Sequence, residues 1–265
     1  MCRVTIVTTA GRPDEESLKL AEFASSELGA TIIPRQKRSV KKLSEIYDAN
    51  VIVAGKNRYE YYAKGAEAPF FFHPNSAAFR LKRVARGEQE PLLTACDLKQ
   101  GDSFLDCTLG IGSDSLLAAF TVGEAGKVTG LEADQNVAFI VKNGMKTYDT
   151  TELPLTACMR HIEVIHADAL TYLQQQLDNS FDVVYMDPMF EQIIEESTNF
   201  EALRHAGSHI ALSDDWVAEA KRVARKRVVL KAHYESEWFE RYGFMRDVRL
   251  SAKFHYGVIQ KNGDA

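Results

Sequence analysis

The chain contains the stretch Asp106-Cys-Thr-Leu-Gly110-Ile-Gly112-Ser113-Asp114, which follows the apolar run 103–105 and precedes a helix-like segment. Its two glycines have no Cβ, so the backbone can turn sharply and approach a ligand closely. The helix that follows offers free N–H groups to an anionic group such as a carboxylate. Ligands of doubly wound parallel sheets bind beyond the carboxyl ends of the strands, so this stretch predicts a cofactor cradle.

The same stretch discriminates between cofactor classes. A nicotinamide or flavin enzyme would complete G-x-G-x-x-G with a third glycine, whereas this chain has Ser115. Asp106 and Asp114 favour a sulfonium cofactor instead. Glu132 ends the next strand-like run, where a carboxylate can accept both hydroxyl protons of a ribose. Asp168 follows the third run and could accept the adenine amine, although an acid at that position is as often only a helix N-cap.

A second motif follows the apolar run 181–186, where the chain continues as Asp187-Pro188-Met189-Phe190. It resembles the Asp/Asn-Pro-Pro-Phe/Tyr motif of amino-methyltransferases. An exocyclic amine on a base is a weak nucleophile because its lone pair is shared with the ring. Asp187 and the Pro188 carbonyl could accept its two protons while Phe190 stacks on the base, so these three residues are the predicted catalytic residues. In the alternative interpretation, Asp-Pro only closes a strand, and Met189 and Phe190 fill core.

Strand-like and helix-like segments alternate from Pro91 onward, which predicts a parallel sheet with helices on both faces. The predicted strands are 103–105, 127–131, 162–165, 181–186 and 227–230, followed by an antiparallel hairpin of 247–251 with 255–260. A smaller α/β unit precedes them, with strands at 4–8, 30–33 and 51–54 and helices at 15–28 and 40–47. The predicted domains are therefore 1–68, a junction at 69–90, and 91–265.

The net charge of −5 is spread unevenly along the chain. Residues 1–90 carry 15 Lys and Arg against 11 Asp and Glu, and the remainder carries 17 against 26. Three basic groups stand out, although such runs are more often solvated faces than phosphate contacts. They are Arg35, Lys37, Arg38, Lys41 and Lys42; Arg80, Lys82, Arg83 and Arg86; and Lys221, Arg222, Arg225, Lys226 and Arg227.

Several other classes of protein are not indicated. No apolar run reaches the length of a signal peptide or a membrane span, so we expect a cytoplasmic location. His205 and His209 lack the glutamate of the helical zinc-protease pattern, and no metal is expected. Lys231 ends the predicted fifth strand, where it could contact phosphate or substrate or simply reach solvent.

Together with Phe72-His73-Pro74-Asn75, Arg80 and Ser251-Ala-Lys253-Phe254, these motifs resemble the RsmJ-type family of small-subunit ribosomal RNA guanine-N2 methyltransferases and its Gram-positive relatives. The likeness covers roughly residues 70–260. It implies a class I methyltransferase fold, a doubly wound seven-stranded mostly parallel sheet with an antiparallel C-terminal hairpin. It also implies S-adenosylmethionine as cofactor, S-adenosylhomocysteine as product, and ribosomal RNA or the small ribosomal subunit as partner.

The motifs and the resemblance together predict further residues, and the resemblance implies the cofactor contacts at Ser113-Asp114, Glu132-Ala133, Asp168-Ala169 and Asp187. Cofactor contacts are expected from Asp106, Gly110, Gly112, Ser113, Asp114, Glu132, Ala133, Asp168, Ala169 and Asp187. Substrate contacts are expected from His73, Arg80, Met189 and Phe190, and the N-terminal domain is expected to help hold RNA. After Phe190, however, the chain is acidic over 191–196, which opposes phosphate. Two alternatives therefore stay open: a class I methyltransferase for a small molecule or protein, and a non-catalytic RNA-binding module with a vestigial cofactor pocket.

Overall fold

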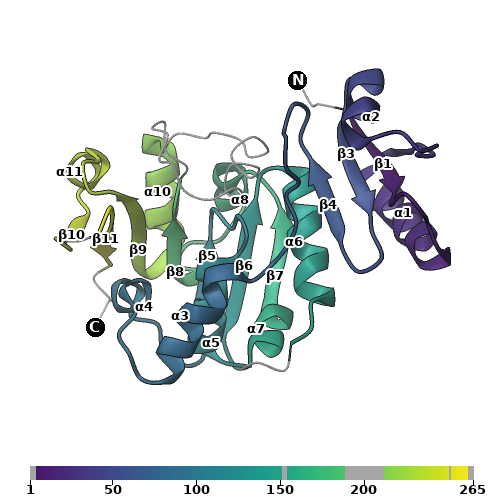
Figure 1. The fold of residues 1–265 in the computed structure, drawn as a ribbon. Coiled ribbons are helices and arrows are strands. Elements are labelled where there is room, and N and C mark those ends of the chain that lie inside the picture. Colours follow the sequence, from purple (N-terminus) through teal and green to yellow (C-terminus); the bar gives the residue numbers. More distant parts are fainter. Residues whose placement is uncertain (1–3, 151–153, 189–211, 251, 262–265) are drawn as a thin grey trace. The chain divides into compact units, whose positions relative to one another are not determined.

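The protein is described by a computed structural model for residues 4–150, 154–188, 212–250 and 252–261 (Figure 1). The chain divides into two compact units. The described residues of the first unit are 4–73 and 134–147. The second unit takes the other described residues and carries both motifs that the sequence singles out.

The second unit is built on a seven-stranded sheet of order β10-β11-β9-β8-β5-β6-β7. Its five strands from β9 to β7 run parallel, and β11 pairs antiparallel with both β9 and β10. This arrangement confirms the predicted fold class. The strands are β5 (Ser103–Asp106), β6 (Lys127–Glu132), β7 (Ile162–His166), β8 (Phe181–Met186), β9 (Ala224–His233), β10 (Met245–Asp247) and β11 (Phe254–Gln260).

Helices lie on both faces of this sheet (Figure 1). One apolar cluster joins α8, α10 and α11 to inward-facing residues such as Leu105, Val184 and Leu230. On the other side α5 packs against α3, α4 and α7. The central strand β8 is buried at all six positions, which is why its sequence is continuously apolar apart from Asp182. The helices are α3 (Asn75–Ala85), α4 (Pro91–Cys96), α5 (Ser113–Val122), α7 (Leu155–His161), α8 (Ala169–Gln174), α10 (Asp214–Val223) and α11 (Trp238–Tyr242).

The C-terminal hairpin differs from the prediction in its first strand. That strand is Met245–Asp247, with Asp247 opposite Tyr256, whereas the sequence predicted 247–251. The apolar residues Val248 and Leu250 suggested a strand, but they are 55% and 101% exposed and add nothing to the core. The connection is held instead by the His255 ring, whose Nε2 lies 3.0 Å from the Arg249 carbonyl oxygen.

The first unit has a four-stranded sheet of order β2-β1-β3-β4, in which β2, β1 and β3 are parallel and β4 is antiparallel to β3. Helix α1 covers the predicted range because its ends are well defined: the Asp14 carboxylate accepts the Ser17 N–H at 2.8 Å, and Gly29 closes it at φ 60°. Strand β4 was not predicted. The elements are β1 (Thr5–Thr9), α1 (Glu15–Leu28), β2 (Thr31–Ile32), α2 (Val40–Tyr47), β3 (Asn50–Ala54), β4 (Tyr59–Tyr62) and α6 (Gln135–Thr147).

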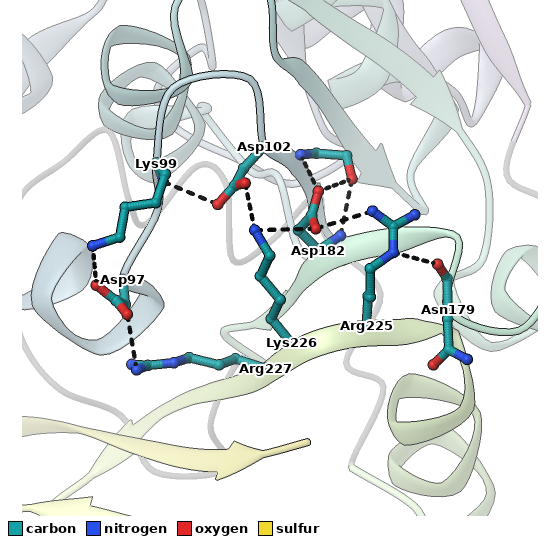
Figure 2. A network of polar contacts seen from close by, with 9 residues as sticks. Asp97, Lys99, Asp102, Asn179, Asp182, Arg225, Lys226 and Arg227 are labelled. Atoms are coloured by element: carbon teal, nitrogen blue, oxygen red, sulfur yellow. Dashed lines mark hydrogen bonds and ion pairs between the residues drawn. The ribbon is translucent and has the colours of Figure 1, made fainter. Parts of the chain in front are cut away.

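An ion-pair network joins the starting ends of β5, β8 and β9 (Figure 2). The buried Asp182 carboxylate accepts the Ser103 N–H at 2.9 Å and the Ser103 hydroxyl at 2.8 Å, and it pairs with Arg225 at 3.1 Å. Lys226 bridges Asp182 at 3.3 Å and Asp102 at 2.6 Å. Burial works against the ionised form, but the Ser103 hydrogen bonds and Lys226 outweigh it and lower the pKa of Asp182.

The basic group at 221–227, predicted as a solvated face, is therefore largely paired with acids. Arg227 reaches Asp97 at 3.1 Å, and Arg222 reaches Asp178 at 2.6 Å. These partners lie far away in sequence, so composition alone could not identify them. The network lies at the edge of the sheet opposite to the carboxyl ends of the strands, and its role is to hold the sheet together.

Replacing Asp182 by Ala is expected to lower the free energy of unfolding by about 2–4 kcal/mol, because the buried Ser103 groups and Lys226 lose their acceptor. Urea unfolding measures this loss. The control is Asp178→Ala, which removes an acid with a 71% exposed side chain, and its expected cost is below about 1 kcal/mol. Equal losses in the two variants would contradict the structural role of Asp182.

Candidate active site

The turn after β5 is held together by Asp106. This carboxylate is 1% exposed, and it accepts the Thr108 N–H at 3.0 Å and the Ser115 hydroxyl at 2.6 Å. It therefore ties the beginning of the turn to the first turn of α5. Burial raises the pKa of Asp106 to about 7, against the opposing effect of these two hydrogen bonds.

Both glycines of the turn adopt the conformation that glycine alone tolerates well. Gly110 has φ 50° and Gly112 has φ 78°, and Gly112 is the residue before α5. Among the described residues, no side chain caps the start of α5, so its first N–H groups are available to an anion. The neighbouring strand also accommodates the turn, because a Cβ at Gly130 would lie 2.5 Å from Leu109 Cδ1.

Asp114, in the first turn of α5, is the centre of a buried polar cluster. Its carboxylate accepts the Tyr185 hydroxyl at 2.6 Å and pairs with Arg80 at 2.5 Å and Lys231 at 3.3 Å. Arg80 also pairs with the buried Glu90 at 2.6 Å. Burial alone would raise the pKa of Asp114, but Lys231, Arg80 and the Tyr185 hydroxyl outweigh it and hold that pKa well below its usual value.

The acidic end of β8 meets the turn after β5. The Asp187 N–H donates to the Thr108 hydroxyl at 2.7 Å, one step beyond the sheet bond from the Cys107 N–H to the Tyr185 carbonyl at 2.9 Å. The Asp187 carboxylate accepts Lys231 Nζ at 2.7 Å, and its side chain is 28% exposed. The two motifs thus lie side by side, as strands that neighbour each other in this sheet require.

The remaining predicted cofactor residues follow along the same edge. Glu132 is the last residue of β6, and its carbonyl accepts the Ala167 N–H at 3.0 Å. The carbonyl of Ala133 lies 3.2 Å from the His166 ring. Asp168 caps α8 by accepting the Thr171 N–H at 2.9 Å through Oδ1, so the capping role weighed for it is present. Ala169, next to it, is buried in the core.

The predicted substrate and catalytic residues have different surroundings. Pro188 is buried directly after Asp187, whereas Met189 and Phe190 lie outside the described residues, as do the acidic run 191–196 and the two histidines at 205 and 209. His73 is exposed and belongs to the first unit. Arg80, expected to contact substrate, has its guanidinium committed to Glu90 and Asp114.

Two members of the cluster were missed in the sequence. Glu90 is the last residue of the predicted junction 69–90, and it belongs to none of the motifs that the sequence shows. Tyr185 offers a weak signal, because a phenol in a fully buried strand needs a hydrogen-bond partner. That partner, Asp114, is 71 residues away.

Comparison with known proteins identifies the family. The SAM_MT model of SAM-dependent methyltransferases matches residues 67–246. The chain belongs to this family. Its cofactor is S-adenosylmethionine, and the class I arrangement of the sheet agrees.

Individual relatives extend this result. The chain is 45% identical to an uncharacterized protein, YpiP, of Bacillus subtilis over 96% of this chain and 99% of that one. It is 32% identical to ribosomal RNA small subunit methyltransferase J of Acinetobacter baumannii strain AYE over 57% of this chain and 58% of the relative. For the Shewanella loihica enzyme of the same name, the values are 29%, 70% and 71%.

Among solved structures, the SAM-dependent methyltransferase NGO1261 of Neisseria gonorrhoeae has the same fold. Its TM-score is 0.60 over 98% of this chain and 97% of that chain, at 17% sequence identity.

The residues at this edge fit the cofactor. An adenosyl group with a methionine tail needs a close backbone approach, an anion-binding helix start and carboxylates for ribose and adenine. The turn at Gly110 and Gly112, the uncapped start of α5 and the acids at the ends of β6 and β7 meet these needs. In the described part of the chain, no group of three or more His, Cys, Asp or Glu could hold a metal ion. Of the described helices, none combines the length and apolar character of a membrane span.

Asp106→Asn is expected to change how stability depends on pH. The folded pKa of about 7 lies above the reference value of 3.8, so the wild-type folded state binds a proton that the unfolded state releases between these values. The contribution of Asp106 to stability therefore falls as pH rises, by about 1.4 kcal/mol per unit between pH 4 and pH 7. The Asn variant lacks this term, so it should gain stability relative to wild type from pH 5 to pH 7. Urea unfolding of both proteins at pH 5 and pH 7 measures this change. The same difference in unfolding free energy between the variant and the wild type at both pH values would contradict the expectation.

Proposed function

We propose that this protein transfers the methyl group of S-adenosylmethionine to the exocyclic N2 amine of a guanine in small-subunit ribosomal RNA. The observation that carries the proposal is the junction of the cofactor turn with Asp187, made by the hydrogen bond from the Asp187 N–H to the Thr108 hydroxyl at 2.7 Å. With the cofactor at the turn, this junction would bring its methyl group and an acceptor of amine protons to neighbouring strand ends. The names of the relatives, ribosomal RNA small subunit methyltransferase J, support RNA as the substrate.

The reaction needs orientation more than acid–base power. The amine nitrogen supplies the electron pair of the new N–C bond, and the breaking S–C bond returns its pair to sulfur, which loses its positive charge. The methylated nitrogen then releases one proton to water. Hydrogen bonds from the amine to the Asp187 carboxylate and the Pro188 carbonyl would aim its lone pair at the methyl group. Phe190 is proposed to stack on the base.

The cofactor is proposed to lie along the carboxyl ends of four strands. The methionine carboxylate would meet the start of α5 at Ser113, next to the turn of Gly110 and Gly112. Asp106 acts by shaping that turn. Further contacts are proposed for Asp114, Glu132 with Ala133, and Asp168 with Ala169. For Asp168, the oxygen Oδ2 would serve the adenine amine, because Oδ1 caps α8.

Lys231 is proposed as the residue that positions Asp187. Its ammonium lies 2.7 Å from Asp187 Oδ2, which leaves Oδ1 for the substrate amine. The same ammonium lies 3.3 Å from Asp114 and so joins the cofactor helix to the acceptor carboxylate. Charged and titratable groups from six elements surround Asp187. They are Arg80 of α3, Asp106 of β5, Asp114 of α5, Tyr185 of β8, Lys231 of β9 and Tyr256 of β11.

The first test measures labelled methyl transfer from S-adenosylmethionine to small ribosomal subunits of a strain that lacks this protein, followed by nucleoside analysis. N2-methylguanosine is the expected product. Asp187→Ala should retain cofactor binding in isothermal titration but turn over about 100-fold more slowly or worse, because the amine is no longer aimed. The matched control is Asp178→Ala, a surface acid near the start of β8, which should keep full activity.

Each other outcome rejects part of the proposal. Another labelled nucleoside would overturn the guanine assignment, and normal turnover of the Asp187 variant would remove Asp187 from the mechanism. A substrate that is a small molecule or a protein is favoured by one observation, the excess of 26 acids over 17 bases in residues 91–265. No transfer to subunits, with cofactor binding intact, would select that candidate. Undetectable cofactor binding would select the non-catalytic RNA-binding module.

Lys231→Met is expected to move the acidic limb of the kcat/KM profile to higher pH. Activity requires the Asp187 carboxylate, so it falls as pH drops through the pKa of that group. Burial, followed by the nearby Asp114, raises this pKa, and Lys231 opposes the rise. Without the ammonium the pKa climbs further. Lys231→Arg keeps the charge and should restore most of the profile, whereas a slower variant with an unmoved limb would indicate that Lys231 only supports packing.

A further inference from the structure

The small sheet of the first unit gathers positive charge at one edge. Strands β2, β1 and β3 are parallel, so the segments that follow them leave from the same edge of the sheet. Those segments carry six cationic residues, which we call the cationic edge: Arg12 after β1, Arg35, Lys37 and Arg38 after β2, and Lys56 and Arg58 after β3.

Contacts between the segments show that these residues lie near one another. Arg35 Nη1 donates to the Thr9 carbonyl at 3.4 Å, and the Ala10 N–H donates to the Ala54 carbonyl at 3.0 Å. These two bonds connect the segment after β1 to the other two. The pKa of Asp14 is lowered chiefly by hydrogen bonds from Ser17 and in smaller part by the charge of Lys56, in agreement with this arrangement.

The segment after β2 has an unfavourable backbone. The Arg38 N–H donates to the Arg35 carbonyl at 2.9 Å, and the two central residues, Gln36 and Lys37, have φ of 47° and 63°. Turns with two left-handed central residues strongly prefer Asn and Gly. A lysine at the second position therefore lowers the stability of the fold. Residues with a strained backbone are enriched at functional sites.

The charge of the edge is only partly compensated. Its acidic neighbours are Asp14, Glu15, Glu16 and Glu60, of which Glu60 pairs with Arg58 at 2.7 Å and Glu15 pairs with Lys19 at 2.7 Å. Arg12, Lys37 and Lys56 are exposed, and none of the three forms an ion pair with another described residue. Arg58 also lies 3.8 Å over the ring of Phe71, a cation–π contact that helps to hold its guanidinium in place.

We propose that the cationic edge binds the phosphate backbone of the RNA substrate. The inference rests on the proposed function, because that function supplies a polyanionic substrate. RNA affinity depends on Lys and Arg that neutralise phosphates. The exposed Arg12, Lys37 and Lys56 offer such cations, whereas residues 91–265 carry an excess of 26 acids over 17 bases, which does not favour phosphate.

The test compares two double variants of the full chain, each losing two exposed lysines of the first unit. Lys37→Gln/Lys56→Gln alters the cationic edge, and Lys142→Gln/Lys146→Gln alters α6. Binding of a labelled single-stranded RNA of mixed sequence is followed by fluorescence anisotropy at several salt concentrations. The edge variant should bind several-fold more weakly, and its plot of log K against log salt should be flatter by about 0.7 for each lost phosphate contact. The α6 variant should match the wild type.

Lys37→Gly separates binding from folding. Glycine suits φ 63° at this position, so the variant should melt at a higher temperature than the wild type. It should nevertheless bind RNA more weakly, because the charge is gone. A more stable protein with lower affinity cannot be explained by damage to the fold.

Several results would overturn the proposal. They are wild-type RNA binding that is undetectable at low salt, an edge variant that binds like the wild type, and an α6 variant that loses as much affinity as the edge variant. Competition by poly-L-glutamate as strong as that by unlabelled RNA would assign the edge to acidic proteins instead. Methyl transfer by the wild type to small ribosomal subunits distinguishes this failure from failure of the proposed function. The edge variants should bind S-adenosylmethionine normally, which shows that their fold is intact.

Discussion

Three carboxylates and two cations share one poorly hydrated region at the carboxyl edge of the large sheet. They form the series Glu90, Arg80, Asp114, Lys231 and Asp187. Removing charges from water is costly, and the cost is recovered only when every member keeps its partners. Because these residues come from different helices and strands, their pairing requires α3, the start of α4, α5, β8 and β9 to meet at this edge. The positions of the turn at Gly110 and Gly112 and of the Asp187 carboxylate follow from that requirement.

The places of the parallel strands along the chain and the position of the turn after β5 could be predicted because both are local properties. Alternating apolar runs give the parallel strands, and Gly110 and Gly112 announce the turn within a few residues. The partners of the charged residues could not be predicted. Lys226 and Asp102, for example, are separated by 124 residues in the sequence. Only the folded sheet brings such residues together. For the same reason Arg80 reads as a surface cation in the sequence but is enclosed by acids in the structure.

Similar ion pairs lie at both edges of the large sheet, but their surroundings differ. At the starting edge, Asp182 satisfies the Ser103 backbone and side chain, and its surrounding cations stabilise the sheet (Figure 2). At the carboxyl edge, Asp187 also has a lysine partner but keeps a partly exposed side chain. The two edges therefore differ in the carboxylate at the end of β8: Asp182 is buried, whereas Asp187 is partly exposed.

Side-chain bonds fasten β5 to β8 at both of their ends, through Ser103 with Asp182 and through Thr108 with Asp187. Strands fixed in this way cannot slide past each other, because a shift of register would break both fastenings at once. The sheet thus fixes the distance between the turn after β5 and the Asp187 end of β8. For the proposed RNA substrate, the target nitrogen would have to reach a fixed point, so the deformability of the RNA around that nucleotide would contribute to target selection.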